Sequence, residues 1–425
     1  MAKIFRILLV FVVFVISNRG LGLESAEASS GSRPKVIFIP GYYGSKISES
    51  VDKKGRPRGE VFLTLSNILF GSSRLQLEAK LDSSPSLVSA GILDSVSVIP
   101  WLYSIDGYGD TVRRVKKEAG KFDIRESEDF YVFDYDWRLD PISILKRFDE
   151  KLIEWKLDSS KEEVYIVAHS MGGWLMSYWL RYGSQAPMGA IENWSGLSQV
   201  KRVMLVAAPF RGTLSVFRNS FWGAPGIPND TFLGANVISS FPSTYYLTPN
   251  EAEFHSPSGN LVTLNLKRPA DWIENRWGAL KDPKSSEANE IATTAFVEFH
   301  VQQSAAFQEK ILAPLTAKSE RFSDRRIQIY IGEGFPTNEL GLQISDSPKR
   351  FAFTAKQIRK SAKQAAQVVT DVDGDETVST ASASAPPYLV ELGAESFKRP
   401  AAHLSILRDD DHIDWNKFFE NKGAQ

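Results

Sequence analysis

Ser170 lies in a sequence pattern that prepares a serine for nucleophilic attack. It belongs to the hexapeptide AHSMGG, residues 168–173, between an apolar run that predicts a buried strand and a run with helical spacing. A sharp turn between strand and helix needs small neighbours, which Ala168 and Gly172 supply. Because a helix N-terminus favours negative charge, we predict that Ser170 attacks a carbonyl carbon and that the Met171 N–H stabilises the oxyanion.

A nucleophilic serine needs a base and a carboxylate, and α/β-hydrolases carry them in the order serine, acid, histidine. In this fold the acid lies in the loop after a late strand, commonly as Asp-x-x-Val, and Asp375 fits that spacing as the expected acid, with Asp373 as the second choice. His412 precedes a terminal helix and is the expected base, with His403 as the alternative. His169 is expected to point away from its neighbour and to pack beside the turn.

A second oxyanion donor is expected in the loop after the first core strand. That strand is the apolar run 36–39, and the loop begins Pro40-Gly41-Tyr42. Gly41 lets the backbone approach the substrate, so the N–H of Tyr42 is the predicted donor.

The elements that must position these residues alternate between continuously apolar strands and amphipathic helices. Such alternation is typical of a mostly parallel sheet with helices on both faces, and together with the turn around Ser170 it indicates an α/β-hydrolase fold. We expect a signal peptide at 1–28, a first part of the core at 29–212, a lid and helical cap insertion at 213–320, and a second part of the core at 321–425. Residues 61–104 form an excursion from the core that is a possible lipid contact.

Composition narrows the classes of function. The 425 residues carry 50 Lys plus Arg against 51 Asp plus Glu, a net charge of −1, which gives no basic field for nucleic acid. The absence of cysteine excludes disulfides and a thiol nucleophile. Two basic residues, the apolar run 7–16 and the small-x-small site at 26–28 are typical of a secretory signal peptide, and an uncleaved membrane anchor is the alternative. We therefore expect an exported protein, periplasmic or secreted and of bacterial origin.

Several motifs together resemble the lecithin:cholesterol acyltransferase family, which includes lysosomal phospholipase A and phospholipid:diacylglycerol acyltransferases. They occur in order along most of the chain, at residues 37–45, 135–138 (Tyr-Asp-Trp-Arg), 168–173, 208–212, 240–243, 373–378 and 412. The resemblance implies Ser170, Asp375 and His412 as triad and Tyr42 and Met171 as oxyanion donors. The animal enzymes carry disulfides, whereas this chain has no cysteine.

The resemblance also implies a mobile lid, placed here at 213–246, in which Phe221 and Trp222 are expected to contact lipid; simple packing in the cap is the alternative. We expect Asp136 and Arg138 to brace the site rather than to react.

The resemblance implies a serine phospholipase A or O-acyltransferase that passes an acyl group from a glycerophospholipid to water or to an alcohol such as a sterol. We expect a lipid interface as partner, and no cofactor, metal ion or nucleic acid. The alternatives are a triacylglycerol lipase or carboxylesterase, a metal-dependent hydrolase built on the acidic loop, and a non-catalytic lipid-binding protein.

Overall fold

The computed structural model describes residues 33–420 with short gaps. The residues outside this description are 1–32, 63, 82–84, 95, 100–102, 106, 226, 228–229, 257, 259, 282–286, 317–321, 355–356, 359–370, 410 and 421–425. The expected signal peptide, 1–28, lies entirely outside the described residues. Within the described part of the chain, no helix combines the length and the apolar character needed to cross a bilayer.

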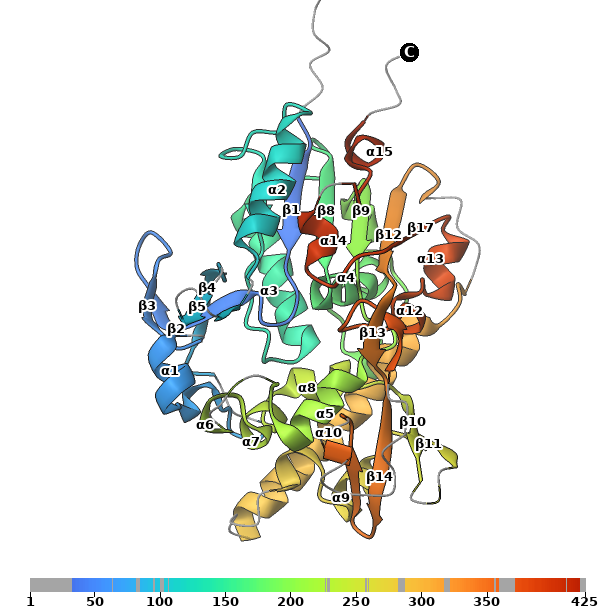
Figure 1. The fold of residues 1–425 in the computed structure, drawn as a ribbon. Helices are drawn as coiled ribbons and strands as arrows, with labels where there is room; N and C mark the ends of the chain where they lie inside the picture. Colours follow the sequence, from blue (N-terminus) through green and yellow to red (C-terminus); the bar gives the residue numbers. More distant parts are fainter. Residues whose placement is uncertain are drawn as a thin grey trace, which may run out of the picture. The chain divides into compact units, whose positions relative to one another are not determined.

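A six-stranded sheet forms the centre of the molecule, and every pair of neighbouring strands in it is parallel (Figure 1). Its order is β17 (Glu395–Arg399), β12 (Arg326–Gly332), β9 (Arg202–Val206), β8 (Val164–His169), β1 (Lys35–Ile39) and β7 (Phe130–Val132). The carboxyl ends of parallel strands meet at one edge, where the loops after them can share a site.

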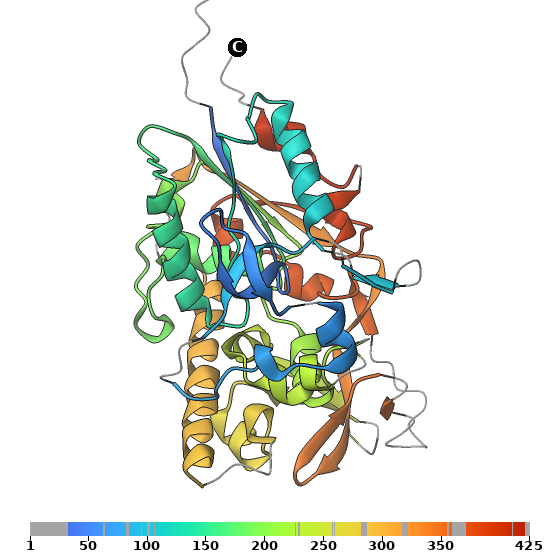
Figure 2. The ribbon, with the colours of Figure 1, turned by 90° about the vertical axis from the view of Figure 1, so that its left-hand side faces the viewer.

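Alternate side chains of the strands serve two separate apolar cores. Ile37 and Ile39 of β1 pack in one core with α3 (Pro141–Glu154), α4 (Met171–Tyr182) and α13 (Pro387–Glu391). Val36 and Phe38 pack in the other with α2 (Gly109–Gly120), α14 (Ser405–Arg408) and α15 (Trp415–Phe419). Figure 2 shows α2 and α3 on opposite sides of the sheet. The predicted fold class, a parallel sheet covered on both faces, is therefore confirmed.

The expected excursion after β1 is a small structure of its own. A three-stranded antiparallel sheet joins β3 (Pro57–Glu60), β2 (Ser45–Val51) and β4 (Val88–Ile92), and a hairpin joins β5 (Val96–Ile99) and β6 (Tyr103–Ile105). In the helix α1 (Leu65–Phe70), Ile68 is buried whereas Phe70 is 81% exposed. One apolar face of this helix therefore packs inward and one aromatic ring faces solvent.

The cap is built from short helices, one long helix and a second sheet, gathered at one end of the central sheet (Figure 1). Its helices are α5 (Leu214–Trp222), α6 (Asp230–Leu233), α7 (Ala235–Ser239), α8 (Pro242–Leu247), α9 (Pro269–Glu274) and α10 (Glu287–Leu312). Its sheet has the order β11 (Leu261–Asn265), β10 (Glu251–His255), β14 (Leu340–Asp346) and β15 (Lys349–Ala352).

Two of the cap strands come from beyond the expected boundary of the cap. β14 pairs with β10, and Phe351 after β14 lies in the aromatic core of the cap with Phe217 and Trp272. The expected division at residue 320 assigns these strands to the central core, whereas they extend the cap sheet. The chain leaves β12 through β13 (Phe335–Asn338) before it enters these strands, and it returns through β16 (Asp371–Gly374), which pairs antiparallel with β13, to α12 (Thr380–Ala383).

Candidate active site

Ser170 occupies a strained turn between β8 and α4. Its backbone has φ 54° and ψ −124°, a conformation that non-glycine residues rarely adopt and that persists only where the surroundings enforce it. The Ser170 N–H donates to the carbonyl oxygen of Val206 at 2.8 Å, and α4 lies close to the end of β1, since a Cβ on Gly172 would lie 2.7 Å from the Ile39 carbonyl oxygen. The predicted sharp turn between strand and helix is therefore present, and it presents the Ser170 side chain at the carboxyl edge of the sheet.

A row of hydrogen bonds joins Ser170 to a histidine and an aspartate. Nε2 of His403 lies 2.8 Å from Oγ of Ser170, and Nδ1 of His403 lies 2.7 Å from Oδ2 of Asp375. A carboxylate only accepts, so Nδ1 carries the proton and Nε2 is left to accept from the Ser170 hydroxyl. Ser170 and Asp375 are 7% and 1% exposed, which keeps this row largely away from water.

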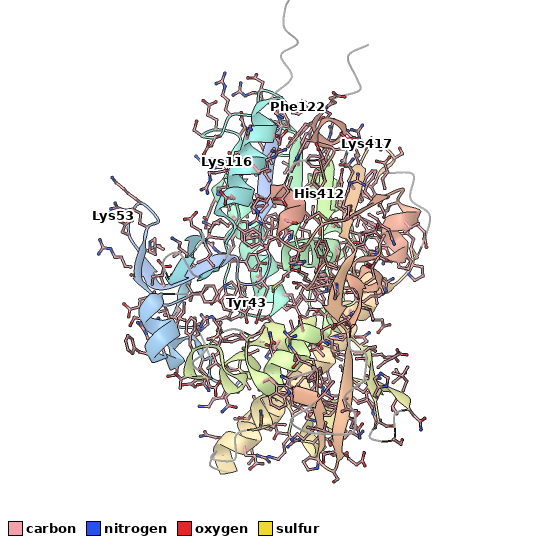
Figure 3. The ribbon with its side chains drawn as sticks, viewed as in Figure 1. Tyr43, Lys53, Lys116, Phe122, His412 and Lys417 are labelled. Carbon is pink, nitrogen blue, oxygen red and sulfur yellow. The ribbon has the colours of Figure 1, made fainter. Side chains whose placement is uncertain are left out.

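The expectation that His412 completes the row is wrong, because His403 occupies that place. His403 lies in the loop that follows β17, and the carboxyl end of β17 is at the same edge of the sheet as the Ser170 turn. His412 lies beyond α14, and its carbonyl oxygen accepts a hydrogen bond from Nε of Arg399 at 2.6 Å. In Figure 3, His412 lies toward the end of the molecule that carries α15. Tyr43, in the loop beside Ser170, lies on the side that faces the cap.

The carboxylate of Asp375 is fixed by its own loop. Its Oδ1 accepts from the N–H of Thr377 at 3.0 Å and of Val378 at 2.7 Å, while its carbonyl oxygen accepts from the N–H of His403. Asp373, the second choice for the acid, instead accepts from the Gly334 N–H and the Thr380 hydroxyl, which hold its pKa below the usual range. Asp375 is therefore the acid that the structure brings to the histidine.

The loop expected to supply an oxyanion donor lies against Ser170. A Cβ on Gly41 would lie 2.6 Å from Cβ of Ser170, so only glycine allows this approach. Tyr42 and Met171 line the same cavity as Ser170, and within the described part of the chain neither backbone N–H has a hydrogen-bond partner. Both predicted donors are thus beside the serine with N–H groups available.

A buried polar chain connects this loop to the histidine. The Tyr108 hydroxyl accepts from the Gly41 N–H at 2.8 Å and lies 2.6 Å from Nδ1 of His169, whose Nε2 lies 2.8 Å from the carbonyl oxygen of His403. A carbonyl only accepts, so Nε2 of His169 carries its proton and Nδ1 accepts from Tyr108. Burial, with the nearby His403, holds the pKa of His169 well below its ordinary value and keeps the ring neutral.

The Tyr-Asp-Trp-Arg element braces the same loop. Arg138 forms a buried two-point ion pair with Asp136, with N–O distances of 2.9 and 2.6 Å, and donates to the Leu75 carbonyl. The Trp137 indole donates to the Ser45 carbonyl, and the Tyr135 hydroxyl donates to that of Pro40. These contacts support the expected structural role for the element, which ties loop 40–45 to the excursion.

A cavity of about 580 Å³ opens beside Ser170, within the roughly 300–1,000 Å³ typical of ligand sites. Its walls come from loop 40–45, the segment 209–233 and the histidine loop, and most are apolar, including Phe62, Leu93, Val216, Ile227, Leu233 and Leu247. A long apolar chain would therefore be sheltered from water here.

Most aromatic residues of the expected lid are buried, some in the aromatic core of the cap and others against the central core. Phe217, Phe232 and Phe241 are buried, and Phe221 is 8% exposed with its ring against Phe217 and other cap aromatics. Trp222 is 40% exposed, and its indole N–H donates to the Phe351 carbonyl at 3.1 Å. Phe221 therefore packs in the cap, which was the alternative to lipid contact. Of the two expected lipid contacts, Trp222 is the one whose side chain is exposed to solvent.

The described residues contain no group of three His, Asp or Glu side chains placed to hold a metal ion. In the acidic loop, the Asp375 carboxylate accepts a hydrogen bond from His403 and the Asp373 carboxylate accepts one from the Thr380 hydroxyl.

A parallel sheet covered on both faces, with a serine on a strained strand–helix turn, defines an α/β-hydrolase fold. The family model described as lecithin:cholesterol acyltransferase matches residues 96–275, which confirms the resemblance that the motifs indicated. Residues 37–45, Asp375 and His403 lie outside the matched range. The match supports an enzyme that hydrolyses or transfers lipid acyl esters. A search of curated protein sequences gives no match.

One solved structure shows a likeness in fold, and two others match with lower TM-scores. The chain is similar to the structure of the Tle4–Tli4 complex, at 14% identity and a TM-score of 0.50, over 91% of this chain and 98% of that one. Phospholipase PlaB from Legionella pneumophila is similar over 51% of this chain and 33% of its own, at 14% identity and a TM-score of 0.26. The lipase of Staphylococcus hyicus is similar over 89% of both chains, at 11% identity and a TM-score of 0.26.

Proposed function

We propose that this protein is a serine phospholipase A with O-acyltransferase capacity, and that Ser170, His403 and Asp375 are its catalytic triad. The observation that carries the proposal is the row of two hydrogen bonds, 2.8 Å and 2.7 Å long, from Ser170 through His403 to Asp375. The row stands beside a largely apolar cavity, as a lipid ester requires.

The geometry supports a reaction in two halves. Oγ of Ser170 attacks the ester carbonyl carbon while Nε2 of His403 takes its proton, and Asp375 stabilises the imidazolium through Nδ1–H. The N–H groups of Tyr42 and Met171 would donate to the oxyanion of the tetrahedral intermediate. When the intermediate collapses, His403 protonates the departing lyso-lipid oxygen and the acyl group remains on Ser170.

The second half passes the acyl group to water or to an alcohol. His403 removes a proton from the acceptor hydroxyl, the acceptor oxygen attacks the acyl carbon, and the proton returns to Oγ as Ser170 leaves. The family description favours an alcohol as one acceptor, and the apolar cavity walls favour exclusion of competing water.

The proposed compartment is the periplasm or the exterior of a bacterial cell. The basic start, the apolar run 7–16 and the small-x-small site at 26–28 support export. Whether the first 28 residues are removed is tested by N-terminal sequencing of protein recovered from the growth medium and the periplasm.

The proposed activity is tested with phospholipid vesicles that contain a long-chain alcohol or a sterol. The wild-type protein should release fatty acid and lyso-lipid and form some acyl-alcohol or sterol ester, and Ser170→Ala should abolish all of these products. Release of fatty acid without formation of acyl-alcohol or sterol ester would show a phospholipase without transferase activity. Turnover of triacylglycerol but not of phospholipid would favour a triacylglycerol lipase. Vesicle binding without turnover of any ester would support a binding protein, and unchanged turnover in Ser170→Ala would refute the triad.

A further inference from the structure

The cavity beside Ser170 contains an arginine without a carboxylate partner. Arg218 of α5 lines the cavity, and its Nε and Nη2 both donate to Oδ1 of Asn219, at 3.2 and 3.1 Å. Among the described residues, no Asp or Glu forms an ion pair with Arg218. Burial lowers its pKa, as is expected of a cation that has lost water without gaining an anion.

Two other charged side chains line the cavity, and neither neutralises Arg218. Arg408 carries the same charge and has Asp409 beside it, with 3.5 Å between Nε and Oδ1. Glu376 follows the acid of the triad, and its backbone N–H donates to the Thr337 hydroxyl. Arg218 is half-buried, and moving a charge out of water without a counter-charge is costly. An anionic ligand in the cavity would supply that counter-charge.

A second polar group of the same cavity also lacks a partner. The Tyr43 hydroxyl is buried and has no hydrogen-bond partner among the described residues, although Tyr43 lines the cavity. Its ring is held by stacking on Phe62 and by edge contact with Trp137. Arg218 and Tyr43 line the same cavity; burial raises the pKa of Tyr43, and the charge of Arg218 opposes that rise.

We propose that Arg218 and Tyr43 form an anion subsite that holds the charged oxygens of the lipid substrate while Ser170 attacks its ester. The inference rests on the proposed function and deepens it by naming what the site recognises. A guanidinium and a hydroxyl can donate together to one phosphodiester, and charge-assisted hydrogen bonds are the stronger kind. The carboxylate of a free fatty acid offers similar oxygens, so the test below distinguishes a phosphodiester from a fatty carboxylate as the ligand.

The test compares kcat/KM on two soluble esters with the same short acyl chains, dioctanoyl phosphatidylcholine and dioctanoylglycerol. Arg218→Gln should lower kcat/KM on the phospholipid about tenfold more than on the neutral diacylglycerol, because only the phospholipid loses a charge-assisted contact. Arg218→Lys keeps the charge without the planar fork and should give a smaller loss. Arg113→Gln, a change at an exposed arginine of α2, is the matched control and should leave the ratio unchanged.

Tyr43→Phe adds a variant that should fold as well as the wild type. It removes a hydroxyl that has no partner, so Tm should not fall, whereas kcat/KM on the phospholipid should fall several-fold relative to the diacylglycerol. Octanoate is included as an inhibitor. If Arg218→Gln weakens octanoate inhibition but leaves the phospholipid preference intact, the subsite holds a carboxylate product and the phosphodiester is overturned as its ligand.

Binding of a dialkyl ether phosphatidylcholine, which has no ester to cleave, separates this inference from the proposed function. Titration calorimetry should show at least about tenfold weaker binding to Arg218→Gln than to the wild type. Equal affinities, or equal losses on both esters, would overturn the subsite even if Ser170 proves essential. Weaker binding together with activity that survives Ser170→Ala would instead refute the triad and leave the subsite standing.

Discussion

Removal of the Tyr108 hydroxyl tests the buried polar chain that connects loop 40–45 to His403. The hydroxyl accepts from the Gly41 N–H and donates to Nδ1 of His169, so Tyr108→Phe removes both hydrogen bonds and nothing else. Both partners are buried, and each unsatisfied buried group costs about 1–3 kcal/mol. Tyr108→Phe should therefore lower the free energy of unfolding by about 2–6 kcal/mol.

The assay is urea denaturation at pH 7, paired with kcat and KM on a soluble short-chain ester. Because Gly41 precedes the predicted oxyanion donor Tyr42, kcat should fall more than KM rises. Tyr131→Phe is the matched control, since that hydroxyl donates to the Glu128 carbonyl at the surface and its loss should cost at most about 1 kcal/mol. A Tyr108→Phe protein no less stable than the control, with unchanged kcat, would refute the reasoning.

Three further predictions concern stability and interface binding. Burial raises the pKa of the Glu339 carboxyl to about 7. The protonated carboxyl therefore contributes its full stability below the unfolded pKa near 4.5, and this contribution is lost as pH rises toward 7. Glu339→Gln should raise Tm more at pH 7.5 than at pH 5, and an equal rise at both pH values would contradict this. Asp136→Asn leaves the buried Arg138 without its counter-charge and should cost about 3–5 kcal/mol in urea denaturation, whereas a loss below about 1 kcal/mol would show that the pair does not brace the loop. Trp222→Ser should reduce activity on vesicles far more than on a soluble short-chain ester, and equal losses would rule out lipid contact by this half-exposed ring.

The nucleophile and its acid could be predicted because their signals are local. The strained turn at Ser170 needs small neighbours within two residues, and the loop of Asp375 closes on the N–H groups two and three residues later. Such short-range requirements leave a pattern in the sequence. The helix predicted after Ser170 by its spacing is present and spans Met171–Tyr182.

The base could not be located with the same certainty because its signal is tertiary. His403 is brought to Ser170 by β17, an edge strand with the sequence ESFKR whose residues are largely exposed. Such a strand has no apolar run, so the sequence does not indicate that a strand of the central sheet ends just before His403. His412, beside a terminal helix, then fitted the expected order equally well.

The cap and its polar groups were the least predictable part. β14 joins the cap sheet although it begins at Leu340, 75 residues after β11 ends at Asn265, and no local pattern predicts such a pairing. Tyr108 and Arg218 acquire their significance only through partners, or the lack of them, that folding brings about.

The most direct test of the triad is a side-by-side measurement of kcat/KM on a soluble short-chain ester for His403→Gln and His412→Gln. The Ser170–His403–Asp375 row predicts that His403→Gln loses at least about 1,000-fold, because base and oriented imidazolium are both removed. His412→Gln should stay within about threefold of the wild type, since the contact that the structure describes for His412 is made by its backbone carbonyl, which the substitution keeps. A large loss in His412→Gln with an active His403→Gln would contradict the account.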